Sequence, residues 1–218
     1  MTAHSSPSVD RPGEHDLLLA VDLQNDFCSG GALAVPNGEA VVPLINRIVP
    51  RFANLALTQD WHPPGHRSFA SSHPGRRPFE TAMLPYGEQT LWPDHCVMGT
   101  SGAAFHEDFD SSRAQLIVRK GFRPEIDSYS ALFENDRKTP TGLIGYLRER
   151  SIQRIFLCGL ATDFCVLYSA LDARREGFEV VLLESACRAI DLAGSLAAAR
   201  AAMQKAGVIF AKAEALAA

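Results

Sequence analysis

The stretch 60–66, DWHPPGH, carries one carboxylate and two imidazoles within seven residues. It follows directly on the apolar run 54–60, NLALTQD, which is typical of a strand. In extended backbone, residues i and i+2 face the same side, so Asp60 and His62 can bring an oxygen and a nitrogen to one metal ion. Two ligands are weak evidence for a metal site, and a third ligand must come from elsewhere in the chain.

Two further charged residues come at or just after apolar runs. Asp22 ends the run 16–22, and a carboxylate there is costly to bury unless it meets a cation, a hydrogen-bond donor or a proton. Lys120 ends the run 114–120, where it can offset Asp22 and acidify a nearby thiol. A solvated lysine at a strand end is an equally good interpretation of that position alone. Asp26 is interpreted as a turn or cap residue.

One of the five cysteines has a distinctive position. Thr162 or Asp163 is expected to cap a helix that begins near Phe164, which places Cys165 in the first turn. Free backbone N–H groups at such a terminus stabilise a thiolate and a neighbouring oxyanion. Together with Asp22 and Lys120, Cys165 could form a nucleophile with its proton carrier and activator. Three other cysteines, Cys28, Cys158 and Cys187, are interpreted as small buried apolar residues.

The elements that must position these residues alternate along the chain. Apolar runs typical of strands occupy 16–22, 54–60, 114–120, 154–159, 178–184 and 208–211. Helical patterns occupy 38–51, 140–150, 163–176 and 194–206. This alternation predicts an α/β fold, a single three-layer α/β/α domain with a mostly parallel sheet of about six strands. The interval 61–113 has no clear period and holds both tryptophans, so we expect a loop that builds the site.

Composition narrows the class of protein. The 218 residues allow one well-formed core, and we expect a disordered tail over 1–15 and one domain over 16–218. The net charge of −4 with interspersed charges argues against a nucleic-acid partner, and no apolar run is long enough to span a bilayer. The tail lacks the apolar segment of a signal peptide, and the odd set of five cysteines contains no CxxC pair. These features predict a cytoplasmic location with free thiols.

Several motifs agree in order and spacing with one known family. Over residues 16–211 the sequence resembles the nicotinamidases, the amide-hydrolysing members of the isochorismatase-like cysteine hydrolases. The stretches that carry the resemblance are VDLQNDFCSGGAL, TQDWHPPGHRSFASSHPG, LWPDHCVMGTSGAAFH, VRKGFRPEIDSYSALF and CGLATDFCVLYSALDA.

The resemblance implies a role for specific residues. A catalytic triad is implied at Asp22, Lys120 and Cys165, and metal ligands at Asp60, His62 and His95. Aromatic walls of a ring-binding pocket are implied at Phe27, Trp92 and Tyr129. A cis peptide bond is implied between Leu160 and Ala161, with the N–H groups of Ala161 and Cys165 as the oxyanion hole.

The resemblance also implies an activity. The expected reaction is hydrolysis of nicotinamide to nicotinate and ammonia through a thioester, in the salvage of NAD, and pyrazinamide is a possible second substrate. The pyridine nitrogen of the substrate is expected on the metal. Two imidazoles and one carboxylate suit zinc, the expected ion, or else iron(II) or manganese. His66 is interpreted as part of the pocket wall, with a ligand role left open, and His73 and His106 have no comparable support.

Two alternatives remain at this point. Another carbamoyl or ureido amidase of the same superfamily would share the Asp–Lys–Cys set, but it would generally lack the metal constellation of 60–62 and 92–96. A non-enzymatic metal-binding or redox-sensing protein would need a resolving cysteine close to Cys165, and Cys158 lies back within a strand. The partner is expected to be a small molecule, and a homo-oligomer is possible.

Overall fold

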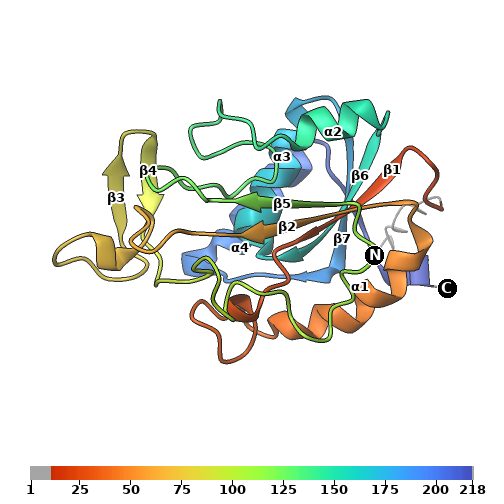
Figure 1. Ribbon diagram of the computed structural model, residues 1–218. Helices are drawn as coiled ribbons and strands as arrows, with labels where there is room; N and C mark the ends of the chain where they lie inside the picture. Colours follow the sequence, from red (N-terminus) through yellow and green to blue (C-terminus); the bar gives the residue numbers. More distant parts are fainter. Residues whose placement is uncertain (1–10, 218) are drawn as a thin grey trace, which may run out of the picture.

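The computed structural model describes residues 11–217 and is built on a six-stranded sheet (Figure 1). The strand order is β5-β2-β1-β6-β7-β8, and every neighbouring pair is parallel. The strands are Asp16–Val21 (β1), Asn54–Asp60 (β2), Leu116–Lys120 (β5), Arg154–Leu160 (β6), Glu179–Arg188 (β7) and Ile209–Ala211 (β8). The predicted α/β class, with a mostly parallel sheet of about six strands, is confirmed.

Helices cover both faces of the sheet and form two apolar cores. Side chains from α1 (Val42–Ile48) and α5 (Glu214–Ala217) pack in one core. Side chains from α2 (Leu143–Glu149), α3 (Leu167–Arg175) and α4 (Ser195–Lys205) pack in the other. The central strands alternate their apolar residues between these cores, with Leu18 in the first and Leu17 in the second. Burial on both faces explains why the strand sequences are almost continuously apolar.

The strand order reverses direction at β1, which lies between β2 and β6. In open parallel sheets, binding sites form beyond the carboxyl ends of the strands at such a point. The four strands β5, β2, β1 and β6 therefore deliver the residues that follow them to one edge of the sheet.

The interval 61–113 contains elements that the sequence did not predict. An antiparallel hairpin of β3 (Thr81–Leu84) and β4 (Gly87–Thr90) lies beyond the arrowheads of β2 and β5 at the left of Figure 1. Isolated bridges join His62 to Val97 and Phe69 to Trp92. These links fold the interval back over the carboxyl edge of the sheet, as expected of a segment that builds a site.

Other boundaries differ from the prediction. The helical stretch 38–51 is α-helical only over α1, with short 3-10 turns at Gly38–Val41 and Val49–Arg51. Of the predicted tail, residues 1–10 lie outside the described part of the chain. The carbonyls of Glu14 and His15 accept hydrogen bonds from Asn54 Nδ2 and Gln153 N, which ties this end of the tail to the sheet.

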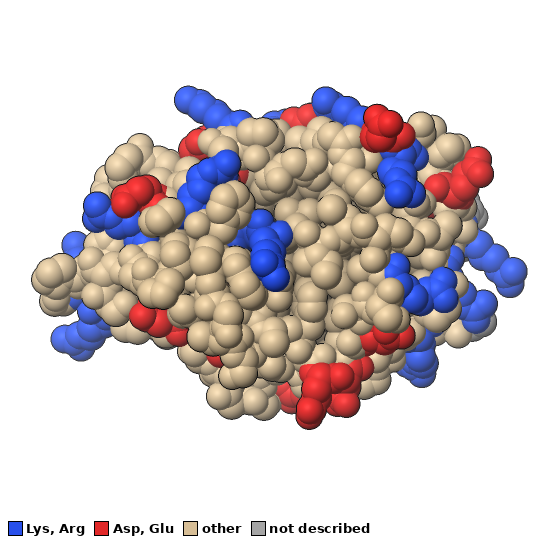
Figure 2. Space-filling model, in the orientation of Figure 1, with Lys and Arg blue, Asp and Glu red and all other residues tan. Residues whose placement is uncertain are grey.

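The surface carries no single dominant charge on the face drawn in Figure 2, where basic and acidic side chains alternate. Within residues 11–217, no helix has both the length and the apolar character needed to cross a bilayer.

Candidate active site

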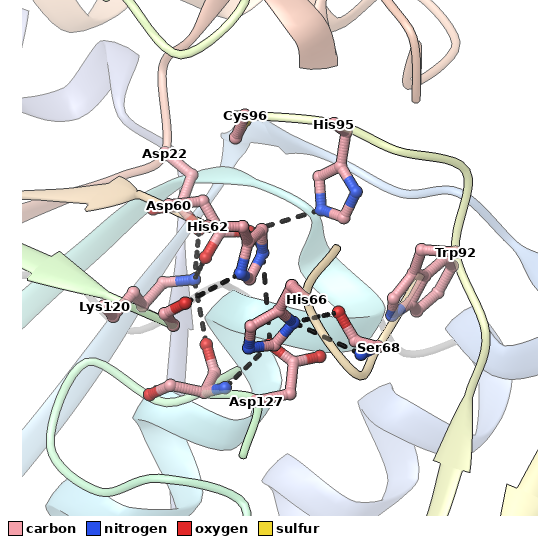
Figure 3. A network of polar contacts seen from close by, with 12 residues as sticks. Asp22, Asp60, His62, His66, Ser68, Trp92, His95, Cys96, Lys120 and Asp127 are labelled. Carbon is pink, nitrogen blue, oxygen red and sulfur yellow. Dashed lines mark hydrogen bonds and ion pairs between the residues drawn. The ribbon is translucent and has the colours of Figure 1, made fainter. Parts of the chain in front are cut away.

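Lys120 lies at the centre of a buried cluster of charges (Figure 3). Its ammonium nitrogen is 2.8 Å from Asp22 Oδ2, 2.8 Å from Asp60 Oδ1 and 3.3 Å from Cys165 Sγ. Lys120 and Asp22 are at most 1% exposed. The ends of β5, β1 and β2 and the segment after β6 therefore bring together the three residues predicted as a triad, with Asp60 as a fourth member.

Burial and charge set the protonation of this cluster. Burial raises the pKa of Asp22, and Lys120 only partly offsets that effect. Burial alone would lower the pKa of Lys120, but the carboxylates of Asp22 and Asp60 outweigh it and hold the lysine charged. Burial also raises the pKa of Cys165 well above its usual range, while Lys120 opposes the shift. Lys120 therefore acts on the thiol in the predicted direction, but desolvation by burial outweighs the lysine.

The residues predicted as metal ligands converge beside this cluster. His62 Nε2 is 3.3 Å and His95 Nε2 is 3.5 Å from Asp60 Oδ2. Donor atoms about 2.1 Å from a tetrahedral ion lie roughly 3.4 Å apart, so these separations match those of ligands around one ion. Asp60 joins the two halves of the site, because its Oδ1 faces Lys120 and its Oδ2 faces the imidazoles.

The two imidazoles have the tautomer that a metal requires. His62 Nδ1 lies 2.9 Å from the carbonyl of Gly121, and His95 Nδ1 lies 2.8 Å from the carbonyl of Pro93. A carbonyl only accepts, so each Nδ1 donates its hydrogen, which leaves each Nε2 able to offer a lone pair to an ion beside Asp60. Among the described residues, His62 Nε2 is buried without a hydrogen-bond partner. Such an orphaned acceptor beside a carboxylate fits a bound cation.

The ring nitrogens of His66 form hydrogen bonds away from this centre. Its Nδ1 lies 2.7 Å from Ser68 Oγ, and its Nε2 lies 2.9 Å from the carbonyl of Arg123. Both nitrogens are thus occupied, and burial lowers the pKa of the ring. Its ring centroid lies 4.4 Å from that of His62, with the two ring planes tilted by 37°. His66 therefore packs against His62 and does not line the pocket, contrary to the expectation of a wall residue.

A small pocket opens onto both halves of the site. Its empty space, counted out to the open mouth, is about 320 Å³. The three aromatic residues predicted for the pocket, Phe27, Trp92 and Tyr129, line it. The other lining residues include Cys165, Ala161, Asp60 and His95. Trp92 Nε1 donates to the Tyr129 hydroxyl at 3.1 Å, which fixes both rings.

Some pocket residues were missed by sequence reasoning. Phe164 packs edge-to-face on Trp92, with centroids 4.8 Å apart, and Asp127 lines the pocket near His62. Gln24 holds Asp60 in place, since its side-chain amide donates to the Asp60 carbonyl and accepts from the Asp60 N–H, both at 2.8 Å. Only the position of Phe164 beside Cys165 in the motif could have indicated its role.

The segment around the thiol differs from the predicted capped helix. The peptide bond between Leu160 and Ala161 is cis, in agreement with the prediction. A π-helical turn, Thr162–Val166, precedes α3. Neither Thr162 nor Asp163 caps it, because the Asp163 carboxylate instead accepts hydrogen bonds from the backbone N–H groups of residues 190 and 191 and from the hydroxyl of residue 195.

Comparison with known proteins decides the family. The isochorismatase domain matches residues 16–215. The chain belongs to the isochorismatase family. A nicotinamidase of Acinetobacter baylyi is 51% identical over 191 residues, which cover 88% of this chain and 89% of that protein. At this identity the relatives support an amidohydrolase enzyme.

Solved structures agree with this assignment. A structure described as an Acinetobacter baumanii nicotinamidase pyrazinamidease superposes with a TM-score of 0.92 at 50% identity and covers 94% of this chain and 99% of that one. PnC1 from L. infantum in complex with nicotinate gives 0.83 at 39% identity, covering 94% and 97%. Pyrazinamidase of Pyrococcus horikoshii in complex with zinc gives 0.74 at 33% identity, covering 91% and 99%.

Proposed function

We propose that the protein is a metal-assisted cysteine amidohydrolase that converts nicotinamide to nicotinate and ammonia. One observation carries the proposal: the thiol of Cys165 and the donor atoms of Asp60 and His95 face the same small aromatic pocket. A nucleophile and a set of metal ligands on one cavity suit a substrate with an amide at one end and a ring nitrogen at the other. The relatives named for nicotinamide, nicotinate and pyrazinamide hydrolysis support this choice.

Asp60, His62 and His95 would hold a divalent ion, which supplies a Lewis-acid contact for the pyridine nitrogen. Zinc is the expected ion, because the ligand set suits it and a relative is described with zinc. Phe27, Trp92 and Tyr129 enclose the ring from the sides. The chain itself thus positions the amide carbon against Cys165.

Cys165 passes its proton to Asp22, and the thiolate forms a bond to the amide carbon. The raised pKa of Asp22 suits it to accept that proton, and the fixed charge of Lys120 stabilises the thiolate that results. The N–H groups of Ala161 and Cys165 would stabilise the oxyanion. The carbonyl of Ala161 occupies the neighbouring N–H groups of Phe164 and Val166, each at 3.1 Å.

Asp22 then gives the proton to the departing nitrogen, the carbon–nitrogen bond breaks, and ammonia leaves a thioester on Cys165. A water molecule that loses its proton to Asp22 attacks the thioester. Nicotinate departs, and the proton returns to the Cys165 sulfur. The same carboxylate serves both half-reactions, which requires it to lie beside the thiol, and the carboxylate and sulfur lie within 4.8 Å.

Ammonia release from nicotinamide by the wild-type protein, Cys165→Ala and Cys187→Ala tests this proposal. Cys187 is a matched control, because it is also buried but does not line the pocket. We expect turnover by the wild type and Cys187→Ala and none by Cys165→Ala. Comparable turnover by Cys165→Ala would contradict the covalent mechanism. Hydrolysis of carbamoyl compounds without that of nicotinamide would favour the ureido amidase alternative.

Four wider expectations remain. Nicotinate would re-enter NAD biosynthesis, and pyrazinamide, with a ring of similar size, would also fit the pocket. A cytoplasmic location stays a prediction supported by five free cysteines. A homo-oligomer also stays a prediction.

A further inference from the structure

Asp127 places a third carboxylate at the site beyond those of the triad and the ligand set. Its side chain is 3% exposed, and Oδ1 lies 4.0 Å from His62 Nε2. Asp127 lines the same pocket as Cys165, and Figure 3 shows it near His62 and His66. His62 Nε2, buried and without a hydrogen-bond partner among the described residues, therefore lies between two carboxylates, Asp60 and Asp127.

Two hydrogen bonds hold the Asp127 carboxylate in place. Its Oδ1 accepts from Ser128 N at 2.8 Å, and its Oδ2 accepts from Gln89 Nε2 at 2.9 Å. Both donors are N–H groups, and each carboxylate oxygen accepts one of the two hydrogen bonds. Gln89 is fully buried on β4 and also donates to the Tyr129 hydroxyl at 2.8 Å. The hairpin thus fixes this carboxylate against the pocket.

The position of Asp127 separates it from the three ligands. Potential ligand atoms of Asp60, His62 and His95 form one group within 4.8 Å, whereas Asp127 groups with His62 and His66. Asp127 therefore lies outside the group formed by the three predicted ligands.

The buried charges show what such a residue would do. Asp22 and Asp60 with Lys120 sum to one negative charge, so a divalent ion held by neutral imidazoles would leave the site with one positive charge. An uncompensated charge in a buried site is costly. The carboxylate of Asp127 brings the sum to zero.

We propose that Asp127 is the anion that balances the charge of the divalent ion and thereby sets the affinity of the site for zinc. This inference rests on the proposed metal centre. It assigns the β3–β4 hairpin a function as well, because Gln89 of that hairpin holds the carboxylate in place.

The test is the dissociation constant for Zn²⁺ alone, measured on metal-free full-length protein by competition with a chromogenic chelator. Asp127→Asn keeps the shape and removes the charge, and Asp127→Glu keeps the charge. Asp172→Asn is the matched control, because Asp172 is a buried carboxylate that does not line the pocket with Cys165. Circular dichroism of each metal-free variant checks folding.

We expect Asp127→Asn to bind zinc about 10–100-fold more weakly, the usual effect of losing a partner outside the ligand set. Asp127→Glu and Asp172→Asn should stay close to wild type. Unchanged zinc affinity in Asp127→Asn, or an equal loss in Asp127→Glu, would overturn the proposal. If Asp127→Asn does not fold, Asp127→Ser gives the same test with a smaller side chain. Wild-type protein that binds no zinc would overturn the metal centre and this inference together, whatever the amidase assay shows.

Discussion

Replacing Lys120 by methionine should remove the cation that two buried carboxylates share. Its ammonium lies 2.8 Å from both Asp22 Oδ2 and Asp60 Oδ1. With an effective dielectric constant of about 20, each contact is worth roughly 6 kcal/mol in Coulomb energy. Desolvation of the charges offsets part of this, and breaking a buried pair costs about 3–5 kcal/mol in practice. We expect the free energy of unfolding of the metal-free protein to decrease by about 3 kcal/mol, the lower end of that range. The decrease is limited because burial already raises the pKa of Asp22 and eases its protonation.

Urea unfolding of four proteins measures this: wild type, Lys120→Met, Asp22→Asn and the double variant. Since Asp22→Asn removes one partner of the lysine, the double variant should be less destabilised than the sum of the single variants, by about 1–3 kcal/mol. Lys138→Met is the control, because Lys138 is exposed and its loss should change stability by less than about 0.5 kcal/mol. Single effects that add to within about 0.5 kcal/mol would refute the reasoning.

Four further substitutions probe the metal side and the pocket. His62→Asn should weaken zinc binding by more than about 100-fold, while His66→Asn should leave it nearly unchanged, because the His66 nitrogens are already bound. Equal losses in chelator competition would make His66 a ligand. Gly121→Ala should lower the free energy of unfolding by about 1–3 kcal/mol, since φ is +68° and a Cβ would lie 2.4 Å from His62 Cε1. Wild-type stability in urea would contradict that close packing. Trp92→Phe loses the hydrogen bond to Tyr129, worth about 1 kcal/mol, and should raise KM for nicotinamide about fivefold. An unchanged KM would show that this bond does not hold the pocket.

The sequence predicted the central sheet well for a physical reason. Strands buried on both faces must be apolar throughout, and helices connect most of the consecutive strands, so runs such as 54–60 are visible without a structure. The hairpin of β3 and β4 was missed because its strands, TAML and GEQT, are short and largely uncovered. A strand that buries few of its side chains does not require an alternating apolar pattern in its sequence.

The individual site residues divide in a similar way. Asp22, Asp60 and Lys120 stand at or next to strand ends, so topology alone brings them together. Asp163 was assigned a cap that it does not make, because its partners lie 27 to 32 residues further along the chain. Asp127 lies in an irregular segment, and its contacts with Gln89 and His62 exist only in the folded chain. Local patterns carry no information about such long-range contacts.

The central claim is that Cys165 attacks the amide carbon while the pocket holds the ring. Its most direct test is intact-protein mass spectrometry after rapid acid quenching of zinc-loaded protein mixed with nicotinamide. The account predicts a transient adduct with the mass of one nicotinoyl group, located on Cys165 by peptide mapping and absent from Cys165→Ala. Turnover with ammonia release but with an adduct on another residue would contradict it.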